Sequence, residues 1–177
     1  RVKDSGVPVL GINSGRLGFL ANIAQEEIPQ AIQWLCAGKC EVEQRALVKL
    51  EMEDNPFSNF NYSLNEISVQ KTERSSLLKV HAYIGGEYLT TYGADGLIVA
   101  TPTGSTAYSL SCGGPIISPS SDNLIITPVS PHNLNMRPLI LPGDVKIRLK
   151  VESRSGDFMV SADSRTRTVP DHYELFI

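Results

Sequence analysis

Apolar and polar residues alternate along much of the chain, a pattern that predicts β-strands. Every second residue is apolar in the run from Val48 to Met52, and the same holds from Val145 to Val151. A period of two places alternate side chains on opposite faces of an extended chain. Each run therefore predicts a strand with one buried face and one face in water.

A hairpin and two fully buried strands are expected in the middle of the chain. Residues 78–84 and 87–92 flank Gly85-Gly86, and a two-glycine connection tolerates the positive φ angles of a tight hairpin turn. Residues 97–100 and 124–126 are apolar throughout and are bounded by Gly, Pro, Asp or Asn. Continuous apolar runs of this length are typical of strands that are covered on both faces.

The first part of the chain has a different pattern, that of one strand followed by one helix. Residues 7–13 form a compact apolar run that predicts a buried strand. Residues 26–37 predict a helix, because apolar side chains recur on one face at the spacing i, i+3, i+4 and i+7. These side chains are Ile28, Ala31, Ile32 and Leu35. The patterns together predict a mainly β fold, a two-sheet β-sandwich preceded by a short βα remnant.

Composition and charge exclude several functional classes. The 177 residues are 41% hydrophobic and 20% charged with a formal net charge of −3, as in ordinary globular proteins. Because there is no basic run, no nucleic-acid or membrane partner is expected. The longest apolar runs have four or five residues, far short of the roughly 20 needed to span a bilayer. Three cysteines, an odd number without a secretion signal, favour reduced thiols and a cytoplasmic protein.

The segment from Asp95 to Pro115 carries the candidate chemistry. Directly after a buried strand, the six residues from Thr101 to Thr106 contain four hydroxyl side chains together with a Pro and a Gly. Such a loop exposes backbone N–H groups and hydroxyls, which suits ribose or phosphate, and Thr106 is expected to cap a helix that begins near Ala107. The plain alternative is a Ser/Thr-rich surface turn that ends in a helix cap.

The same segment resembles the signature of NAD kinases, enzymes that phosphorylate the 2'-hydroxyl of the adenosine ribose of NAD to give NADP. Three further segments match that family in the same order, and the resemblance covers residues 7–165. These segments are Gly11 to Leu20, Leu64-Asn65-Glu66 and Val160 to Asp163. A family with this signature implies a β-rich C-terminal domain of the NAD kinase/diacylglycerol kinase-like fold.

The resemblance also implies a division of the chain into two parts. Residues 1–21 would be the remnant of an N-terminal α/β domain, and residues 22–177 would be the β-rich NAD-binding domain. The chain begins at Arg1 in a segment that reads like the end of a helix, so we expect it to be a fragment of a longer protein.

By resemblance, side chains from three segments would contact the dinucleotide. Asn65 would hydrogen-bond the adenine or ribose and Glu66 a sugar hydroxyl, roles that suit an amide and a carboxylate. Asp95 would contact the nicotinamide ribose or amide, whereas from the residues alone it is an ordinary Asp in a Gly-flanked turn. The residues that would line the adenosine pocket are Thr106, Ala107, Tyr108 and Ser111.

Two more candidate binding residues lie near the ends of the matching region. Phe19 would lie against adenine, although core packing is the ordinary role of such a side chain. Asp163 belongs to the segment that would close the site near the C-terminal end of the domain.

No residue of this chain is assigned to catalysis or to a metal. In the family, a Gly-Gly-Asp-Gly motif contributes the proposed base and helps to hold the donor phosphates, and that motif does not occur in this sequence. We expect this motif upstream of residue 7. The resemblance further implies that the intact enzyme uses Mg²⁺ with ATP or inorganic polyphosphate. The present chain is expected to be weakly active or inactive.

Other readings of the sequence remain open. One is a non-catalytic NAD(P)-binding module, which the missing motif allows. Another is a lipid kinase-like protein of the same fold group, although such proteins lack the Thr-Pro-Thr-Gly-Ser-Thr-Ala-Tyr pattern that occurs here. The family resemblance further implies a homodimer or homotetramer.

Overall fold

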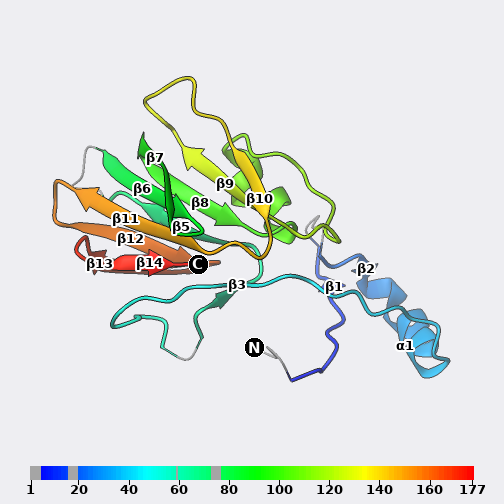
Figure 1. Ribbon diagram of the computed structural model, residues 1–177. Coiled ribbons are helices and arrows are strands. Elements are labelled where there is room, and N and C mark those ends of the chain that lie inside the picture. Colours follow the sequence, from blue (N-terminus) through cyan, green and yellow to red (C-terminus); the bar gives the residue numbers. More distant parts are fainter. Residues whose placement is uncertain (1–4, 16–19, 59, 73–76) are drawn as a thin grey trace. The chain divides into compact units, whose positions relative to one another are not determined.

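The chain divides into two compact units, Arg1–Gln44 and Arg45–Ile177. The computed structural model describes residues 5–15, 20–58, 60–72 and 77–177 (Figure 1). The domain boundary expected after residue 21 stays a prediction. Within the described ranges, no helix is long and apolar enough to cross a bilayer.

The first unit holds one short parallel strand pair and one helix. Strand β1 (Ile12–Asn13) pairs with β2 (Ile23–Ala24), and a 3-10 turn at Gln25–Glu27 leads into helix α1 (Ile28–Cys36). The predicted helix is therefore confirmed, one or two residues shorter at each end. Of its predicted apolar face only Ala31 is buried.

The buried strand predicted over residues 7–13 is wrong in extent and in burial. Only its last two residues are extended in a ladder, while Val7 is 59% and Val9 73% exposed. An apolar run becomes a buried strand only where neighbouring strands and a second layer cover it. Among the described residues, β1 pairs only with the two-residue β2, which is too short to cover the run.

Two antiparallel sheets of six and four strands make up most of the second unit, and Figure 1 shows them as stacked layers. The larger has the order β10-β9-β8-β5-β12-β13 and the smaller the order β14-β11-β6-β7. The strands of the larger sheet are β5 (Glu66–Gln70), β8 (Gly96–Ala100), β9 (Asn123–Val129), β10 (Leu139–Pro142), β12 (Asp157–Ala162) and β13 (Arg165–Pro170). Those of the smaller are β6 (Leu78–Ile84), β7 (Glu87–Ala94), β11 (Ile147–Ser153) and β14 (Glu174–Phe176). The mainly β, two-sheet sandwich is confirmed.

The predicted hairpin is confirmed with its turn chemistry. Strands β6 and β7 pair from Ile84 and Glu87 outward, and Gly85 and Gly86 have φ angles of 58° and 92°. Both angles lie in the left-handed region, which glycine enters without a steric penalty. The two glycines therefore allow the tight turn that sets the register of this sheet.

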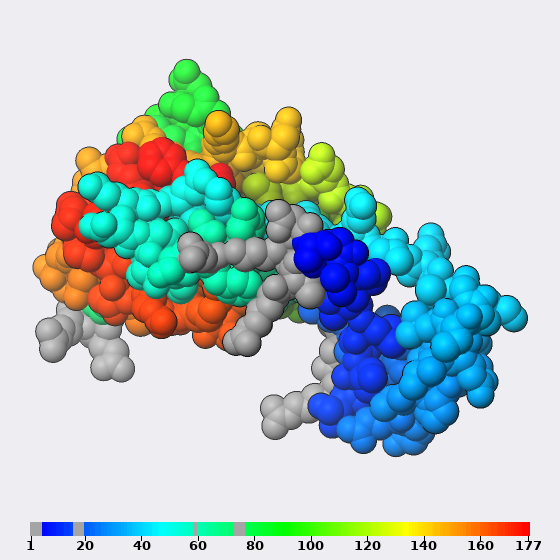
Figure 2. All heavy atoms as spheres, turned by 90° about the horizontal axis from the view of Figure 1, so that it is seen from below, coloured from blue at the N-terminus to red at the C-terminus, as the bar shows by residue number. Residues whose placement is uncertain are grey.

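The run predicted as a strand from residue 48 is shorter than expected because it changes partners. Strand β3 (Val48–Lys49) pairs with β4 (Tyr62–Ser63), after which Glu51 forms a backbone bridge with Phe176. In the space-filling view, the cyan residues of this segment lie against the red C-terminal residues (Figure 2). Leu50, between these two pairings, is fully buried.

The core lies between the two sheets and explains the fully apolar strands. Leu97 and Val99 of β8 pack in the main cluster with residues of both sheets, such as Phe158 and Leu149. The alternate side chains of β8 face the other way, where Ile98 and Ala100 form a second cluster with Ile125, packed against Cys112 and Ile117. Strand β8 is thus buried on both faces, as predicted, because the segment after it folds back over the sheet.

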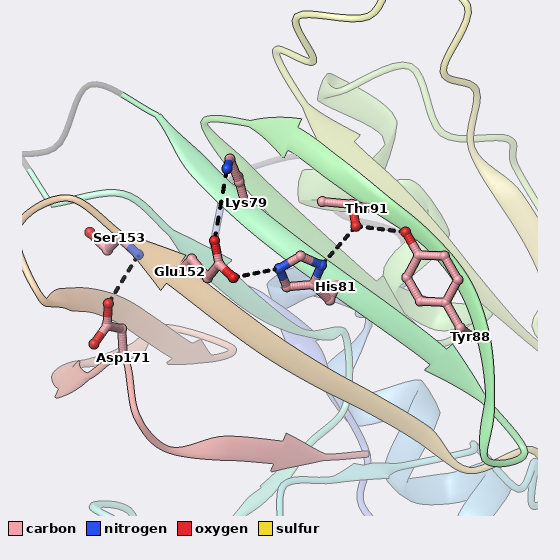
Figure 3. Close-up of polar contacts among 7 residues, drawn as sticks. All are labelled: Lys79, His81, Tyr88, Thr91, Glu152, Ser153 and Asp171. Carbon is pink, nitrogen blue, oxygen red and sulfur yellow. Dashed lines mark hydrogen bonds and ion pairs between the residues drawn. The ribbon is translucent and has the colours of Figure 1, made fainter.

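The outer face of the smaller sheet is polar. His81 contacts Thr91 through Nδ1 at 2.7 Å and Glu152 through Nε2 at 3.1 Å, while Lys79 lies 3.9 Å from the second Glu152 oxygen (Figure 3). Tyr88 joins the network through Thr91 at 2.7 Å. These contacts stabilise the wet face of a half-buried sheet, the pattern expected for alternating strands.

Candidate functional site

Three segments that are distant in sequence meet at one end of three adjacent strands of the larger sheet, β8, β5 and β12. This end of the three strands is called the site edge below. In the antiparallel register, Glu66 at the start of β5 lies opposite Ala100 at the end of β8. On the other side of β5, Ile67 lies opposite Ala162 at the end of β12. The residues before β5, after β8 and after β12 are therefore neighbours, and they include most of the sequence candidates.

Asp163, directly after β12, holds the segment before β5 in place. Its carboxylate accepts hydrogen bonds from the backbone N–H groups of Leu64 at 2.9 Å, Asn65 at 2.9 Å and Glu66 at 3.2 Å. The Asp163 N–H in turn donates to the Glu66 carbonyl at 3.0 Å. One side chain thus satisfies three successive peptide groups, so the Leu64-Asn65-Glu66 backbone has little freedom.

Thr101, directly after β8, holds the same segment from its other side. Its N–H donates to the Asn65 carbonyl at 2.9 Å and its hydroxyl to the Leu64 carbonyl at 2.6 Å. The same hydroxyl accepts from the Gly104 N–H at 3.0 Å. Gly104 lies so close that a Cβ there would be 2.0 Å from the Asn65 carbonyl oxygen. Only glycine fits this approach without a backbone shift.

The hydroxyl-rich segment uses most of its hydroxyls to build itself. It forms a 3-10 turn at Thr103–Thr106 and a short helix α2 (Tyr108–Ser111). Ser105, which is buried, accepts from the Ile117 N–H at 3.1 Å. The Ser109 hydroxyl, also buried, lies 2.8 Å from that of Thr127. The loop is therefore a rigid wall rather than a solvated surface turn.

The predicted helix cap at Thr106 is wrong. The residue before the helix is Ala107, and no side chain caps it. Thr106 instead ends the 3-10 turn, and its hydroxyl donates back to the Thr103 carbonyl at 3.3 Å. A hydroxyl at the end of such a turn lies close to the carbonyl three residues earlier, which competes with the capping role.

Glu66 carries the most unusual electrostatics of the site. One of its carboxylate oxygens, Oε2, is buried without a hydrogen-bond partner. Burial first, and then the nearby negative charge of Asp163, raises its pKa from 4.5 to about 7, although a hydrogen bond from the Tyr108 N–H opposes the shift. A buried polar atom without a partner is costly, and such atoms cluster where ligands bind.

Tyr108 lies near enough to both Glu66 and Asp95 for their charges to act on its hydroxyl. Burial, and then the nearby Cys112 and Asp95, raise the pKa of its hydroxyl. Asp95 itself lies between β7 and β8 and forms an ion pair of 2.8 Å with Lys71. Asp95, the residue predicted to contact a nicotinamide group, is therefore close enough to Tyr108 for its charge to act on the Tyr108 hydroxyl.

The structure brings most sequence candidates to the site edge. Asp163 is hydrogen-bonded to the backbone of Asn65 and Glu66. Thr106, Ala107 and Tyr108 come a few residues after Thr101, whose N–H is hydrogen-bonded to the Asn65 carbonyl. Ser111 is exposed at the end of α2, and Phe19 lies outside the described residues. Their roles toward a ligand stay predictions.

Two residues of the candidate loop have positioning contacts that the sequence does not predict. Thr101 and Gly104 belong to the hydroxyl-rich loop that the sequence predicts, but the sequence does not predict that they fix this loop against the segment before β5. The available signal was a glycine in a Ser/Thr-rich turn directly after a buried strand, which often marks a close backbone approach. Lys71, the partner of Asp95, had no local signal because ion pairs between strands leave no pattern in the sequence.

Comparison with known proteins identifies relatives of this chain. The sequence model of the ATP-NAD kinase C-terminal domain matches residues 64–174. An NAD kinase of Bacteroides fragilis is 49% identical over 177 residues, which is 100% of this chain and 61% of the relative. The chain spans about 60% of the length of the curated relatives it matches, as with an NAD kinase of Cytophaga hutchinsonii at 46% identity over 99% of this chain.

Solved structures with the same fold include a nucleotide complex. Yeast NADH kinase complexed with NADH matches with a TM-score of 0.87 and 32% identity, covering 96% of this chain and 49% of the yeast chain. At this identity and TM-score, the likeness extends to the sequence as well as the fold.

Replacing Gly104 should damage the site through a steric clash. We expect Gly104→Ala to lower the free energy of unfolding by about 3 kcal/mol, because its Cβ meets backbone rather than a flexible side chain. Gly93→Ala is the matched control, since its nearest neighbour would be a Leu77 methyl at 3.8 Å. Denaturant unfolding measures both, and equal effects would contradict the close approach.

The raised pKa of Glu66 predicts a pH-dependent stability. Between the unfolded value of 4.5 and the folded value of about 7, only the folded protein holds the proton, so stability falls as pH rises through this window. Glu66→Gln should remove this loss. The difference in stability between the variant and the parent should therefore shift by about 2 kcal/mol in favour of the variant from pH 4 to pH 8, after allowance for partial solvation. The exposed Glu87→Gln is the control in urea unfolding. A parallel pH profile for Glu66→Gln and the parent would refute it.

Proposed function

The chain belongs to the NAD kinase family through its C-terminal domain, and from this premise we propose that the site around Glu66 binds the adenosine half of a pyridine dinucleotide. The observation that carries the proposal is the partnerless, buried Glu66 oxygen beside a backbone segment that is held from two sides. A sugar hydroxyl is the kind of donor that would satisfy this oxygen. The NADH complex of the yeast relative supports a dinucleotide as the ligand.

The chemistry of the surrounding residues suits this ligand. Asn65 offers both a donor and an acceptor, which a base edge or a ribose requires. Tyr108 adds an aromatic face with a polar tip. Asp95, near the Tyr108 hydroxyl, would accept from the nicotinamide amide or its ribose. Because Asn65 and Glu66 are held by backbone contacts, their side chains can be preorganised before the ligand arrives.

For the longer protein we propose phosphoryl transfer from ATP or polyphosphate to the 2'-hydroxyl of NAD, giving NADP. In that step the hydroxyl oxygen forms a bond to phosphorus, the bond to the leaving phosphate breaks, and the hydroxyl proton passes to a base. A solved NAD kinase of Archaeoglobus fulgidus in complex with ATP supports ATP as a donor; it matches with a TM-score of 0.80 and 29% identity, over 96% of this chain and 64% of that protein.

The described residues do not fit a dedicated magnesium site. They contain no group of three or more His, Cys, Asp or Glu side chains that could hold a metal. The Asp163 carboxylate is already engaged by three N–H groups. Mg²⁺ often binds through substrate phosphates and few protein ligands, so its participation is a proposal for the intact enzyme.

The homodimer or homotetramer and the cytoplasmic location remain predictions from the sequence. The non-catalytic dinucleotide-binding module stays the second candidate function, because the Gly-Gly-Asp-Gly motif does not occur among the 177 residues. The lipid kinase-like alternative receives no support, since the relatives named above are NAD or NADH kinases.

Binding of NAD should depend on the proposed contacts. We expect Asn65→Ala and Asp95→Asn each to weaken NAD binding by about 1 to 3 kcal/mol, the cost of leaving a polar partner unmet. Calorimetric titration measures the change, with the exposed Asn135→Ala and Asp144→Asn as matched controls. Unchanged affinity in both site variants would mean that the pocket is mapped onto the wrong residues.

Catalysis and binding should separate in this chain. We expect the 177-residue chain to bind NAD but to form little or no NADP from NAD and ATP with Mg²⁺, because it lacks the motif that would supply the base. A coupled NADP assay, with the Bacteroides fragilis relative as the positive control, measures this. Turnover comparable to that of the relative would contradict the expectation.

A further inference from the structure

The geometry around Asp163 indicates how the proposed site is held ready. Both carboxylate oxygens are occupied within the protein: Oδ2 accepts from the Leu64 N–H, and Oδ1 accepts from the N–H groups of Asn65 and Glu66. A carboxylate so engaged has little capacity left for a ligand. We propose that Asp163 is a positioning residue, which fixes the Leu64-Asn65-Glu66 backbone and keeps Glu66 Oε2 available for a ligand hydroxyl. This inference rests on the proposed function.

The backbone of Asp163 supports this assignment. Its φ angle is 52°, in the left-handed region that few residues other than glycine, Asn and Asp enter readily. The two-residue turn between Ala162 of β12 and Arg165 of β13 requires this angle, and the Asp163 N–H donates to the Glu66 carbonyl at 3.0 Å. The conformation turns the carboxylate back toward the start of β5, where three N–H groups converge on it.

The same arrangement places two carboxylates close together. The groups that shift the pKa of Glu66, besides burial, are Asp163 from the turn after β12 and the Tyr108 N–H from the start of α2. Cys112 and Asp95 act on the Tyr108 hydroxyl next to them. The charge of Asp163 therefore favours the protonated form of Glu66 in the free protein, whereas a sugar hydroxyl that donates to Glu66 favours the ionised form.

Binding of NAD should thus release a proton from Glu66. We expect the affinity of the parent chain for NAD to rise about tenfold between pH 6 and pH 8.5, as the Glu66 carboxyl ionises near its pKa of about 7. Glu66→Gln should abolish this pH dependence, because the amide does not titrate in this range. The pH profile reports on the carboxylate pair, so a variant that only lowers the stability of the fold would leave it unchanged.

The test is calorimetric titration of NAD at pH 6, 7 and 8.5 into the 177-residue chain and its variants. Asp163→Asn should bind NAD about tenfold more weakly at pH 8.5, since its amide nitrogen cannot accept from the backbone N–H groups. It should also weaken the pH dependence, because the negative charge beside Glu66 is gone while the burial of Glu66 remains. The matched control is Asp171→Asn, which removes a carboxylate that accepts from the Ser153 N–H at 3.1 Å outside this site (Figure 3).

Several results would overturn the proposal. Parent-like affinity and pH profile in Asp163→Asn would show that the carboxylate does not position the site. Weakened binding with an unchanged pH profile would reduce Asp163 to a general structural residue. Asp163→Ser is the second variant. If both Asp163→Asn and Asp163→Ser fail to fold, the carboxylate is required for folding itself, and its assignment as a positioning residue fails. If the folded parent chain does not bind NAD at all, the proposed function fails first and this inference with it.

Discussion

Three peptide N–H groups converge on the Asp163 carboxylate, and the arrangement of the candidate site depends on that contact. It joins the start of β5 to the end of β12 across nearly 100 residues of sequence. Charge-assisted hydrogen bonds of this kind are stronger than neutral ones and satisfy donors that would otherwise be buried without partners. The site is therefore built from the connections at the ends of β5, β8 and β12, and this contact ties the connection before β5 to the one after β12.

The hydrophobic core positions the opposite wall. Strand β8 is covered on one face by the sandwich and on the other by the segment that follows it, through the cluster of Ile98, Ala100 and Ile125. This packing brings Thr101 and Gly104 against the Asn65 backbone. A rigid wall with internal hydroxyl contacts leaves Glu66 Oε2 as a buried acceptor that the protein does not use. The fold thus creates an unmet hydrogen bond where the proposed ligand would supply a donor.

The sequence predicts the strands best where local chemistry decides the structure. Alternation and the paired glycines identify the β6–β7 hairpin, because both signals lie within a few residues. It predicts less well where a distant partner decides, as with residues 7–13, whose apolar pattern does not reveal the layer that would cover it. At the site, family resemblance selects Asn65 and Glu66 by residue type. The hydrogen bonds from Asp163 join distant segments and leave no local pattern, so their geometry required the structure.

A crystal structure of the chain with NAD tests the central claim most directly. The account predicts a ribose hydroxyl of the adenosine half within hydrogen-bond distance of Glu66 Oε2, with the three N–H contacts of Asp163 unchanged. Dinucleotide bound away from the site edge of β5, β8 and β12 would contradict it. So would NAD bound at that edge with Glu66 Oε2 still lacking a partner.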